Sequence, residues 1–249
     1  MIKGMADLTE QARARGLILN ETKFHNRGII KNQHIETLML YMDILLEWNR
    51  KVNLTAVTNP IDVIIKHFLD SLTLIYYIPE NARCADVGSG AGFPGLPLAI
   101  TRQDTSWVLI DSLKKRTDFL ITTGERLNVT NIACERGRAE DLGKSPDHRD
   151  RYDICCARAV APLRVLTEYC LPFVKKGGLF IAMKGPGAER ELLEARGVIT
   201  RLNGGAEEVR KLRLPFRGIA RSLVFIRKHA GTPEGYPRNQ SRIKNDIIK

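Results

Sequence analysis

The sequence lacks long apolar runs, paired-cysteine motifs and low-complexity tracts. Its apolar runs fall far short of the ~18 residues that a membrane-spanning helix needs, so we expect no membrane span. The first residues carry no secretory hydrophobic region. The five cysteines are odd in number and form no C-x-x-C pair, which favours reduced core residues over disulfides or metal ligands. We therefore expect a cytoplasmic protein with no metal site.

Positive charge is concentrated towards the end of the chain. The net charge is +11, and residues 201–249 hold 12 basic but only 4 acidic side chains, whereas residues 1–80 hold 9 of each. A localised basic surface is typical of proteins that bind polyanions, of which nucleic acid is the most common. A solubilising basic tail at residues 231–249 is the alternative interpretation.

The first 80 residues have the spacing of amphipathic helices. Over residues 32–49 the apolar side chains share one helical stripe. Asn59 and Pro60 are typical of an N-cap and a first helical position, which predicts another helix after them. We expect residues 1–80 to form a helical extension packed on the domain that follows.

After residue 81 short apolar runs alternate with amphipathic stretches. The expected strands span residues 82–87, 107–110, 132–134, 154–157, 179–183, 209–214 and 223–226. The last two runs are close enough in sequence to pair as an antiparallel hairpin. This order predicts an α/β fold over residues 81–230, with a doubly wound, Rossmann-like, mostly parallel sheet and an antiparallel C-terminal hairpin.

A glycine-rich stretch, DVGSGAGFPGLP at residues 86–97, follows the first expected strand. Gly88, Gly90 and Gly92 allow a tight turn and a close approach of the backbone to a ligand. Pro94 suits the start of a helix, whose free amides favour an electron-rich group nearby. Because parallel sheets bind ligands at the carboxyl ends of their strands, this stretch predicts a ligand site.

Two ligands fit the stretch. Gly90-x-Gly92-x-x-Gly95 matches the dinucleotide pattern, and Asp111 follows about 20 residues later, where it can accept both ribose hydroxyls of NAD or of S-adenosylmethionine. Asp86 would repel a pyrophosphate but suits the ammonium or sulfonium group of S-adenosylmethionine. We expect no second, substrate-carrying domain after this one. The residues favour S-adenosylmethionine, with an NAD-dependent dehydrogenase as the alternative.

The glycine-rich stretch resembles the signature of the bacterial 16S rRNA guanine-N7 methyltransferases, also called glucose-inhibited division protein B. Further blocks resemble that family in the same order: WNRKVNLT at 48–55, KHFLDS at 66–71, LIDSLKKR at 109–116, ARA at 157–159 and MKG at 183–185. Two regions depart from the family: residues 1–30, and the tail, where Ser241, Ile243 and Ile247 replace frequent glycine and proline.

The resemblance implies a seven-stranded class I methyltransferase that uses S-adenosylmethionine to methylate N7 of one guanine, position 527, in 16S rRNA. It carries cofactor-binding roles onto Gly88, Phe93, Ala139, Glu140 and Arg158. The implied partner is 16S rRNA or the small ribosomal subunit, and we expect a monomer because nothing suggests a coiled coil. A non-catalytic rRNA-binding assembly factor is another alternative.

The chemistry of N7 methylation agrees with the residues. Guanine N7 has a lone pair and no proton at neutral pH, so in-line attack on a methyl group needs no general base, and orientation dominates. An amino-nitrogen enzyme usually shows Asn/Asp-Pro-Pro-aromatic after the fourth strand, where this chain has ARAVAP at 157–162. A C5-pyrimidine enzyme needs a nucleophilic cysteine, whereas Cys155 and Cys156 lie within an expected strand.

Three further side chains are candidate catalytic residues. Arg158 can pair with the methionine carboxylate or an rRNA phosphate, or lie on the surface. Lys184 can reach guanine O6 or a phosphate, or be structural. Asp70 shares a helical face with Lys66 and His67 and either accepts from the guanine edge or ties the helices to the sheet.

Basic residues near the last two expected strands are candidates for contact with rRNA phosphates. Such contacts would orient the RNA and make its affinity depend on salt, with little readout of the bases. The candidates are Arg210, Lys211, Arg213, Arg217 and Arg221.

Overall fold

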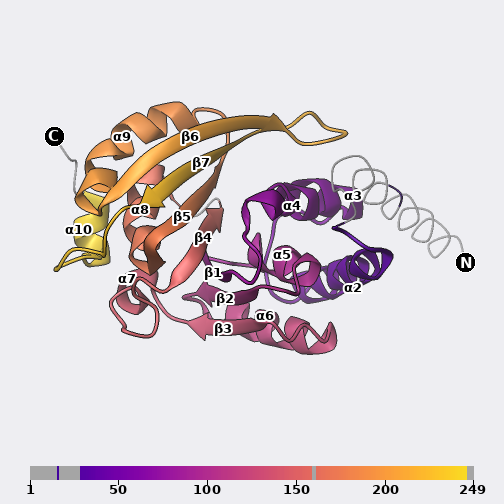
Figure 1. Ribbon diagram of the computed structural model, residues 1–249. Helices are drawn as coiled ribbons and strands as arrows, with labels where there is room; N and C mark the ends of the chain where they lie inside the picture. The colour runs from indigo at the N-terminus through magenta and orange to yellow at the C-terminus, as the bar shows by residue number, and fades with distance from the viewer. Residues whose placement is uncertain (1–15, 17–28, 159–160, 246–249) are drawn as a thin grey trace, which may run out of the picture.

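The computed structural model describes residue 16, residues 29–158 and residues 161–245. The parts of the expected helical extension at residues 1–15 and 17–28, and the end of the tail at residues 246–249, lie outside the described residues. Within them, seven strands form one sheet in the order β3-β2-β1-β4-β5-β7-β6 (Figure 1). The expected α/β fold is confirmed.

Six of the seven strands in the described residues run in the same direction, and β7 runs in the opposite one. The strands are β1 (Arg83–Val87), β2 (Ser106–Asp111), β3 (Ile132–Arg136), β4 (Tyr152–Arg158), β5 (Val174–Lys184), β6 (Gly204–Arg213) and β7 (Ala220–Lys228). Strands β1 to β5 pair in parallel, and β7 runs antiparallel between β5 and β6. The expected hairpin is therefore present, with its second strand inside the sheet and its first at the edge.

Helices cover both faces of the sheet. One face carries α2 (Asn32–Asn49), α3 (Pro60–Val63), the π-helix η1 (Ile64–Leu69), α4 (Asp70–Leu72), the 3-10 helix η2 (Ile75–Tyr77), α5 (Gly95–Thr101) and α6 (Lys114–Arg126). The other carries α7 (Ala139–Leu142), α8 (Leu163–Cys170), the 3-10 helix η3 (Leu171–Phe173), α9 (Ala188–Arg201) and α10 (Gln240–Asn245). Along β1, Cys84 packs in the first layer and Ala85 in the second, because strand side chains alternate between faces.

The N-terminal helices pack directly against the sheet layer. Residues Ile35, Leu38 and Met42 of α2 are buried in the same apolar cluster as Leu96 of α5 and Phe119 of α6. As expected, Asn59 caps the next helix, since its side chain accepts from the amide of Asp62, and Pro60 is the first helical residue. The segment from Pro60 to Leu72 then runs as short α, π and α pieces.

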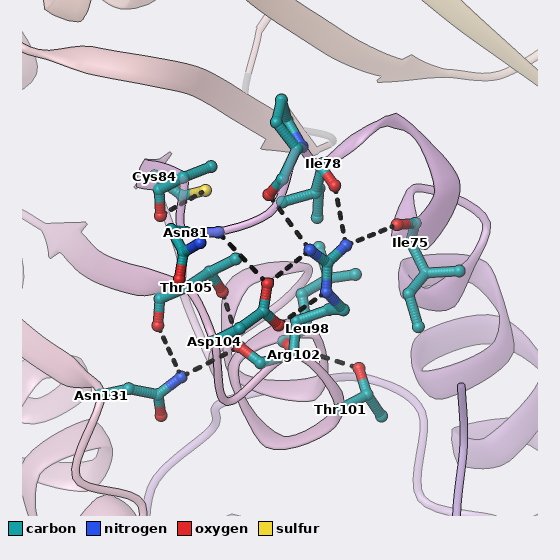
Figure 2. Close-up of polar contacts among 12 residues, drawn as sticks. Ile75, Ile78, Asn81, Cys84, Leu98, Thr101, Arg102, Asp104, Thr105 and Asn131 are labelled. Carbon is teal, nitrogen blue, oxygen red and sulfur yellow. Dashed lines mark hydrogen bonds and ion pairs between the residues drawn. The ribbon is translucent and has the colours of Figure 1, made fainter. Parts of the chain in front are cut away.

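A buried arginine fixes the end of this N-terminal segment (Figure 2). Arg102 donates to the carbonyl oxygens of Ile75, Ile78 and Pro79 at 3.3, 2.7 and 3.1 Å, and it also pairs with Asp104 at 2.7 Å. Nearby, the Asn131 amide donates to three carbonyl oxygens, those of Ala99, Arg102 and Thr105. These contacts join the chain after η2 to the turn that precedes β2.

The β6–β7 hairpin extends from the sheet towards α3 and α4 (Figure 1). Near its tip, Arg217 forms an ion pair with Asp62 at 3.0 Å. Arg210 donates to the Tyr77 hydroxyl and stacks its guanidinium over the Tyr77 ring. The basic hairpin and the N-terminal helices therefore form one continuous surface.

Among the described residues, no helix has the length and apolar character that crossing a membrane requires. All five cysteines are free thiols, and four of them are buried. The described part of the chain contains no group of three or more His, Cys, Asp or Glu side chains placed to hold a metal ion.

The Arg102 contacts predict a large stability effect. Arg102→Ala leaves three backbone carbonyl oxygens without their donor, so we expect the free energy of unfolding to fall by about 2–4 kcal/mol. Arg126→Ala is the matched control, because its ion pair with Glu47 is exposed and solvent screens most of its contribution to stability. Urea unfolding of both variants measures the difference, and equal losses would contradict the role given to Arg102.

Candidate functional site

A cavity of about 480 Å³ opens at the carboxyl ends of β1, β2, β3 and β4. Strands β2 and β3 lie on one side of β1, and β4 and β5 lie on the other, so the cavity sits where the strand order reverses. Its size is within the range of small-molecule sites. The expected cofactor residues that line it are Gly88, Gly90, Phe93, Asp111, Ala139, Glu140 and Arg158.

The turn after β1 has the backbone conformation that its glycines predict. Gly88, Gly90 and Gly92 have φ angles of 79°, 59° and 95°, a region that other residues seldom adopt. A Cβ atom on Gly90 would come no nearer than 3.9 Å to the surrounding protein, so the space above the turn is open to a ligand. The Gly90 amide donates to Asp111 at 3.0 Å, which holds the turn against the end of β2.

Asp86 is placed differently from the other expected cofactor residues. It is fully buried and does not line the cavity. Its Oδ2 atom accepts the Gly95 amide at 2.8 Å, at the start of α5, which begins one residue after the expected Pro94. The electron-rich group at this helix N-terminus is thus Asp86 itself. Burial raises the pKa of Asp86 to about 7, although the Gly95 amide opposes the shift.

Two carboxylates follow neighbouring strands and face the cavity. Asp111 ends β2, is 4% exposed, and accepts from the amides of Gly90 and Leu113 and from Arg116 at 3.2 Å. Glu140, in α7 after β3, is 5% exposed and lies 3.8 Å from Arg138. Two backbone amides hold the Asp111 carboxylate in place. A ligand hydroxyl that donates to Asp111 is therefore positioned by the backbone of the turn.

At the other end of the cavity, Arg158, His67 and Phe93 form a stacked group. The His67 and Phe93 rings stack with centroids 4.5 Å apart, and the Arg158 guanidinium lies over the Phe93 ring at 5.0 Å. Burial, then the positive charge of Arg158, lowers the pKa of His67 to about 3. His67 Nδ1 lies 3.2 Å from an Arg158 nitrogen and 3.1 Å from the carbonyl oxygen of Lys66, and Nε2 lies 2.9 Å from the Thr55 hydroxyl.

Asp70 lies behind this group rather than in the cavity wall. It is 1% exposed, and its carboxylate pairs with Arg158 and with Arg221, each at 3.1 Å. Asp70 therefore joins α4 to β4 and to the β6–β7 hairpin, which is the structural alternative considered for it above. Its oxygen atoms face two arginines instead of open space.

Lys184 also lies outside the cavity wall. Its ammonium group pairs with Glu191 of α9 at 2.8 Å and donates to the carbonyl oxygen of Ala161 at 2.9 Å. Glu191 in turn accepts from the amide of Leu163. Lys184 thus holds the end of β5 against α9 and the start of α8.

The basic residues of the hairpin differ in their partners. Arg210 pairs with Glu208, Lys211 with Glu189, Arg217 with Asp62 and Arg221 with Asp70. Arg213 donates instead to the carbonyl oxygen of Gly218 in the hairpin turn. Among these five, Arg213 thus carries a positive charge that no carboxylate in the described residues is shown to balance.

Several residues of the cavity wall had no sequence signal. Thr55 lies in one of the family-like blocks, but its residue type does not indicate a place in the cavity wall. Arg138, Tyr169 and Gln240 come from three separated segments that converge at the Glu140 end of the cavity. Only their spatial convergence reveals them.

Comparison with known proteins agrees with this geometry. The family model for rRNA small subunit methyltransferase G matches residues 34–220. The chain belongs to this family. The relative of that name from Alkaliphilus metalliredigens is 46% identical over 92% of this chain and 95% of its own length. The one from Desulforamulus reducens is 48% identical, over 80% of this chain and 83% of its own.

Solved structures show the same fold at low identity. An O-methyltransferase from Bacillus cereus, in complex with SAH, has a TM-score of 0.55 at 15% identity and covers 76% of this chain and 91% of its own. TYW2 from M. jannaschii, in complex with AdoMet, has a TM-score of 0.52 at 15% identity and covers 64% of this chain and 74% of its own.

This member of the small subunit methyltransferase G family is thus an S-adenosylmethionine-dependent rRNA methyltransferase. The dehydrogenase alternative is set aside. The cavity suits that methyl donor, because it combines an open glycine turn, two carboxylates for hydroxyl and amino groups, and an arginine for a carboxylate.

The raised pKa of Asp86 predicts a pH effect on stability. The carboxyl has a pKa of about 7 in the folded chain and 3.8 ordinarily, so the folded state retains a proton that the unfolded state releases. Its contribution to stability is therefore complete below pH 4 and is lost as the pH rises towards 7. Asparagine does not titrate, so Asp86→Asn lacks this loss. We therefore expect the free energy of unfolding of Asp86→Asn to rise relative to that of the unaltered chain between pH 4 and 7. Urea unfolding across that range measures it, and a constant difference would contradict the burial argument.

Proposed function

We propose that this enzyme transfers the methyl group of S-adenosylmethionine to N7 of guanine 527 in 16S rRNA. The observation that carries the proposal is the state of His67, the one histidine among the described residues that line the cavity. Both of its ring nitrogens have partners, and its pKa of about 3 makes it a weak base. An amino or hydroxyl acceptor loses a proton on methylation, whereas N7 has none to lose, so N7 suits a site whose histidine does not serve as a base.

The charges around Arg158 also suit this reaction. The bound donor supplies a methyl group on a positively charged sulfur, and the methylated purine carries that charge afterwards. Asp70 balances part of the charge on Arg158 and Arg221, and His67 remains neutral. The aromatic face of Phe93 lies against Arg158 and offsets part of its positive charge. The site thus tolerates positive charge before and after the transfer.

In the proposed arrangement the donor spans the cavity from Arg158 to Glu140. Arg158 pairs with the methionine carboxylate, and the turn at Gly88 and Gly90 approaches the donor closely. Asp111 accepts from the ribose hydroxyls, and Glu140, with Ala139 beside it, lies next to the adenine. This order follows the order of the strand ends, from β4 through β1 and β2 to β3.

The rRNA is proposed to lie across the β6–β7 hairpin and the N-terminal helices. Arg210, Lys211, Arg213, Arg217 and Arg221 are the candidate phosphate contacts. Four of them have carboxylate partners that phosphates must compete with, so Arg213 is expected to contribute most. We propose that Asp70 and Lys184 act by positioning Arg158 and the end of β5, respectively, and not by touching the guanine.

The position of the methyl group tests the reaction. Small subunits that lack this methylation are incubated with the enzyme and methyl-labelled S-adenosylmethionine, and we expect one label on 16S rRNA. Borohydride and aniline treatment should cleave the rRNA at that guanine, because the reaction is specific for N7-methylguanine. Label on an exocyclic nitrogen would refute the N7 proposal. Tight rRNA binding without any transfer would instead support the assembly-factor alternative.

Two substitutions should separate donor binding from rRNA binding. Asp111→Asn removes the charge that accepts from the ribose, so we expect donor affinity to fall by about tenfold or more, with rRNA affinity nearly unchanged. Arg213→Ala should do the reverse and reduce the slope of log affinity against log salt by about 0.7–0.9. Calorimetry and filter binding at several salt concentrations measure both. Arg190→Ala, an exposed arginine paired with Glu194 on α9, is the control for charge.

A further inference from the structure

The segment after β7, residues 229–245, returns to the cavity, and we call it the C-terminal strap. Its start is anchored by Lys228, whose side chain is fully buried. Lys228 pairs with Asp150 at 3.1 Å and donates to Thr232 at 2.7 Å. Asp150 also accepts from the amide and the hydroxyl of Thr232. The strap therefore leaves the sheet in a fixed direction.

Two arginines hold the middle of the strap. Arg149 donates to the carbonyl oxygens of Thr232, Pro233 and Tyr236. Arg238 pairs with Glu168, a residue of α8 that is 1% exposed, at 2.7 Å, and its backbone amide donates to the same carboxylate. A carboxylate buried this deeply is costly unless it is paired, so displacing the strap would be unfavourable.

These anchors bring α10 against the Glu140 end of the cavity. Ile243 is 1% exposed in the apolar layer beneath, and Gln240 lines the cavity with Tyr169 and Glu140. Arg138 donates to Gln240 Oε1 at 2.9 Å. The other end of the amide, Nε2, therefore keeps hydrogen atoms to donate.

A buried hydroxyl marks the same end of the cavity. The Tyr169 oxygen is buried and has no hydrogen-bond partner among the described residues. The Gln240 side chain lies beside this hydroxyl as a potential hydrogen-bond partner and lowers its pKa. Burial first, and the charge of Glu140 second, raise that pKa, so the phenol is a neutral donor or acceptor. A buried polar atom without a partner is expected to find one in a ligand.

We propose that Gln240 binds the adenine of the methyl donor, with its Nε2 donating to a ring nitrogen while Glu140 accepts from the exocyclic amino group. An amide is well matched to adenine, which presents acceptors and a donor along its edges. Arg138 sets which end of the amide faces the base, and the strap sets its position. The inference rests on the proposed placement of the donor, with its adenine at the Glu140 end.

The test compares ligand analogues in two backgrounds. Binding of S-adenosylhomocysteine, and of analogues in which carbon replaces N1, N3 or N7 of the adenine, is measured by calorimetry for the unaltered chain and for Gln240→Ala. We expect the unaltered chain to bind one of the three analogues roughly three- to tenfold more weakly than the parent compound. In Gln240→Ala this discrimination disappears, because the donor to that nitrogen is gone.

Controls distinguish this proposal from misfolding and from a wrong donor site. Ser241→Ala, an exposed neighbour in α10, should retain the full discrimination. Gln240→Glu has the same shape but no N–H donor, and it should lose the discrimination while retaining the thermal unfolding midpoint. Discrimination that persists in both Gln240 variants would overturn the role of Gln240. If the unaltered chain does not bind S-adenosylhomocysteine at all, the donor placement itself fails.

Discussion

The hydrogen bond between the buried carboxylate of Asp86 and the Gly95 amide determines the shape of the site. It joins β1 to the first turn of α5, and the glycine turn between these two points lines the cavity. A Cβ atom at Gly95 would lie 2.4 Å from Leu109 and 2.8 Å from Asp86, so this close packing requires glycine. The positions of Asp111 and Phe93 both depend on this turn. Asp111 accepts from the Gly90 amide, and Phe93 is itself a residue of the turn.

A second constraint, Asp70, joins three parts of the chain. Its carboxylate lies between Arg158, which faces the cavity, and Arg221, on the basic hairpin. Because it sits in the N-terminal helices, these helices support the orientation of Arg158 as well as covering one face of the sheet. The arginine that stacks on Phe93 is therefore held from behind by residues distant in sequence.

The sequence predicted the fold, and its glycine spacing and strand-end acid, which are local patterns, placed Gly88, Gly90 and Asp111 in the cavity wall. The other expected wall residues came from the family resemblance: Phe93, Ala139, Glu140 and Arg158. Sequence pattern did not predict the π-helix within residues 64–69, whose apolar spacing is close to that of an α-helix. It placed Asp86 next to the ligand because its charge suits a sulfonium, whereas the buried amide of Gly95 takes that carboxylate. Sequence pattern did not indicate Gln240 or Tyr169, because their convergence depends on long-range contacts. These contacts are made by Arg238, Arg149 and Lys228, whose partners lie about 60 to 90 positions away.

The cluster around Arg102 lies near the start of β2, whereas the cavity opens at the carboxyl ends of the strands. The contacts that stabilise the fold around Arg102 and the cavity that binds the donor therefore lie at opposite ends of the strands. Substitutions that adapt such an enzyme to a hotter or colder habitat can accumulate around Arg102 and Asn131 without passing through the residues that meet the donor. The two properties are free to evolve at separate rates.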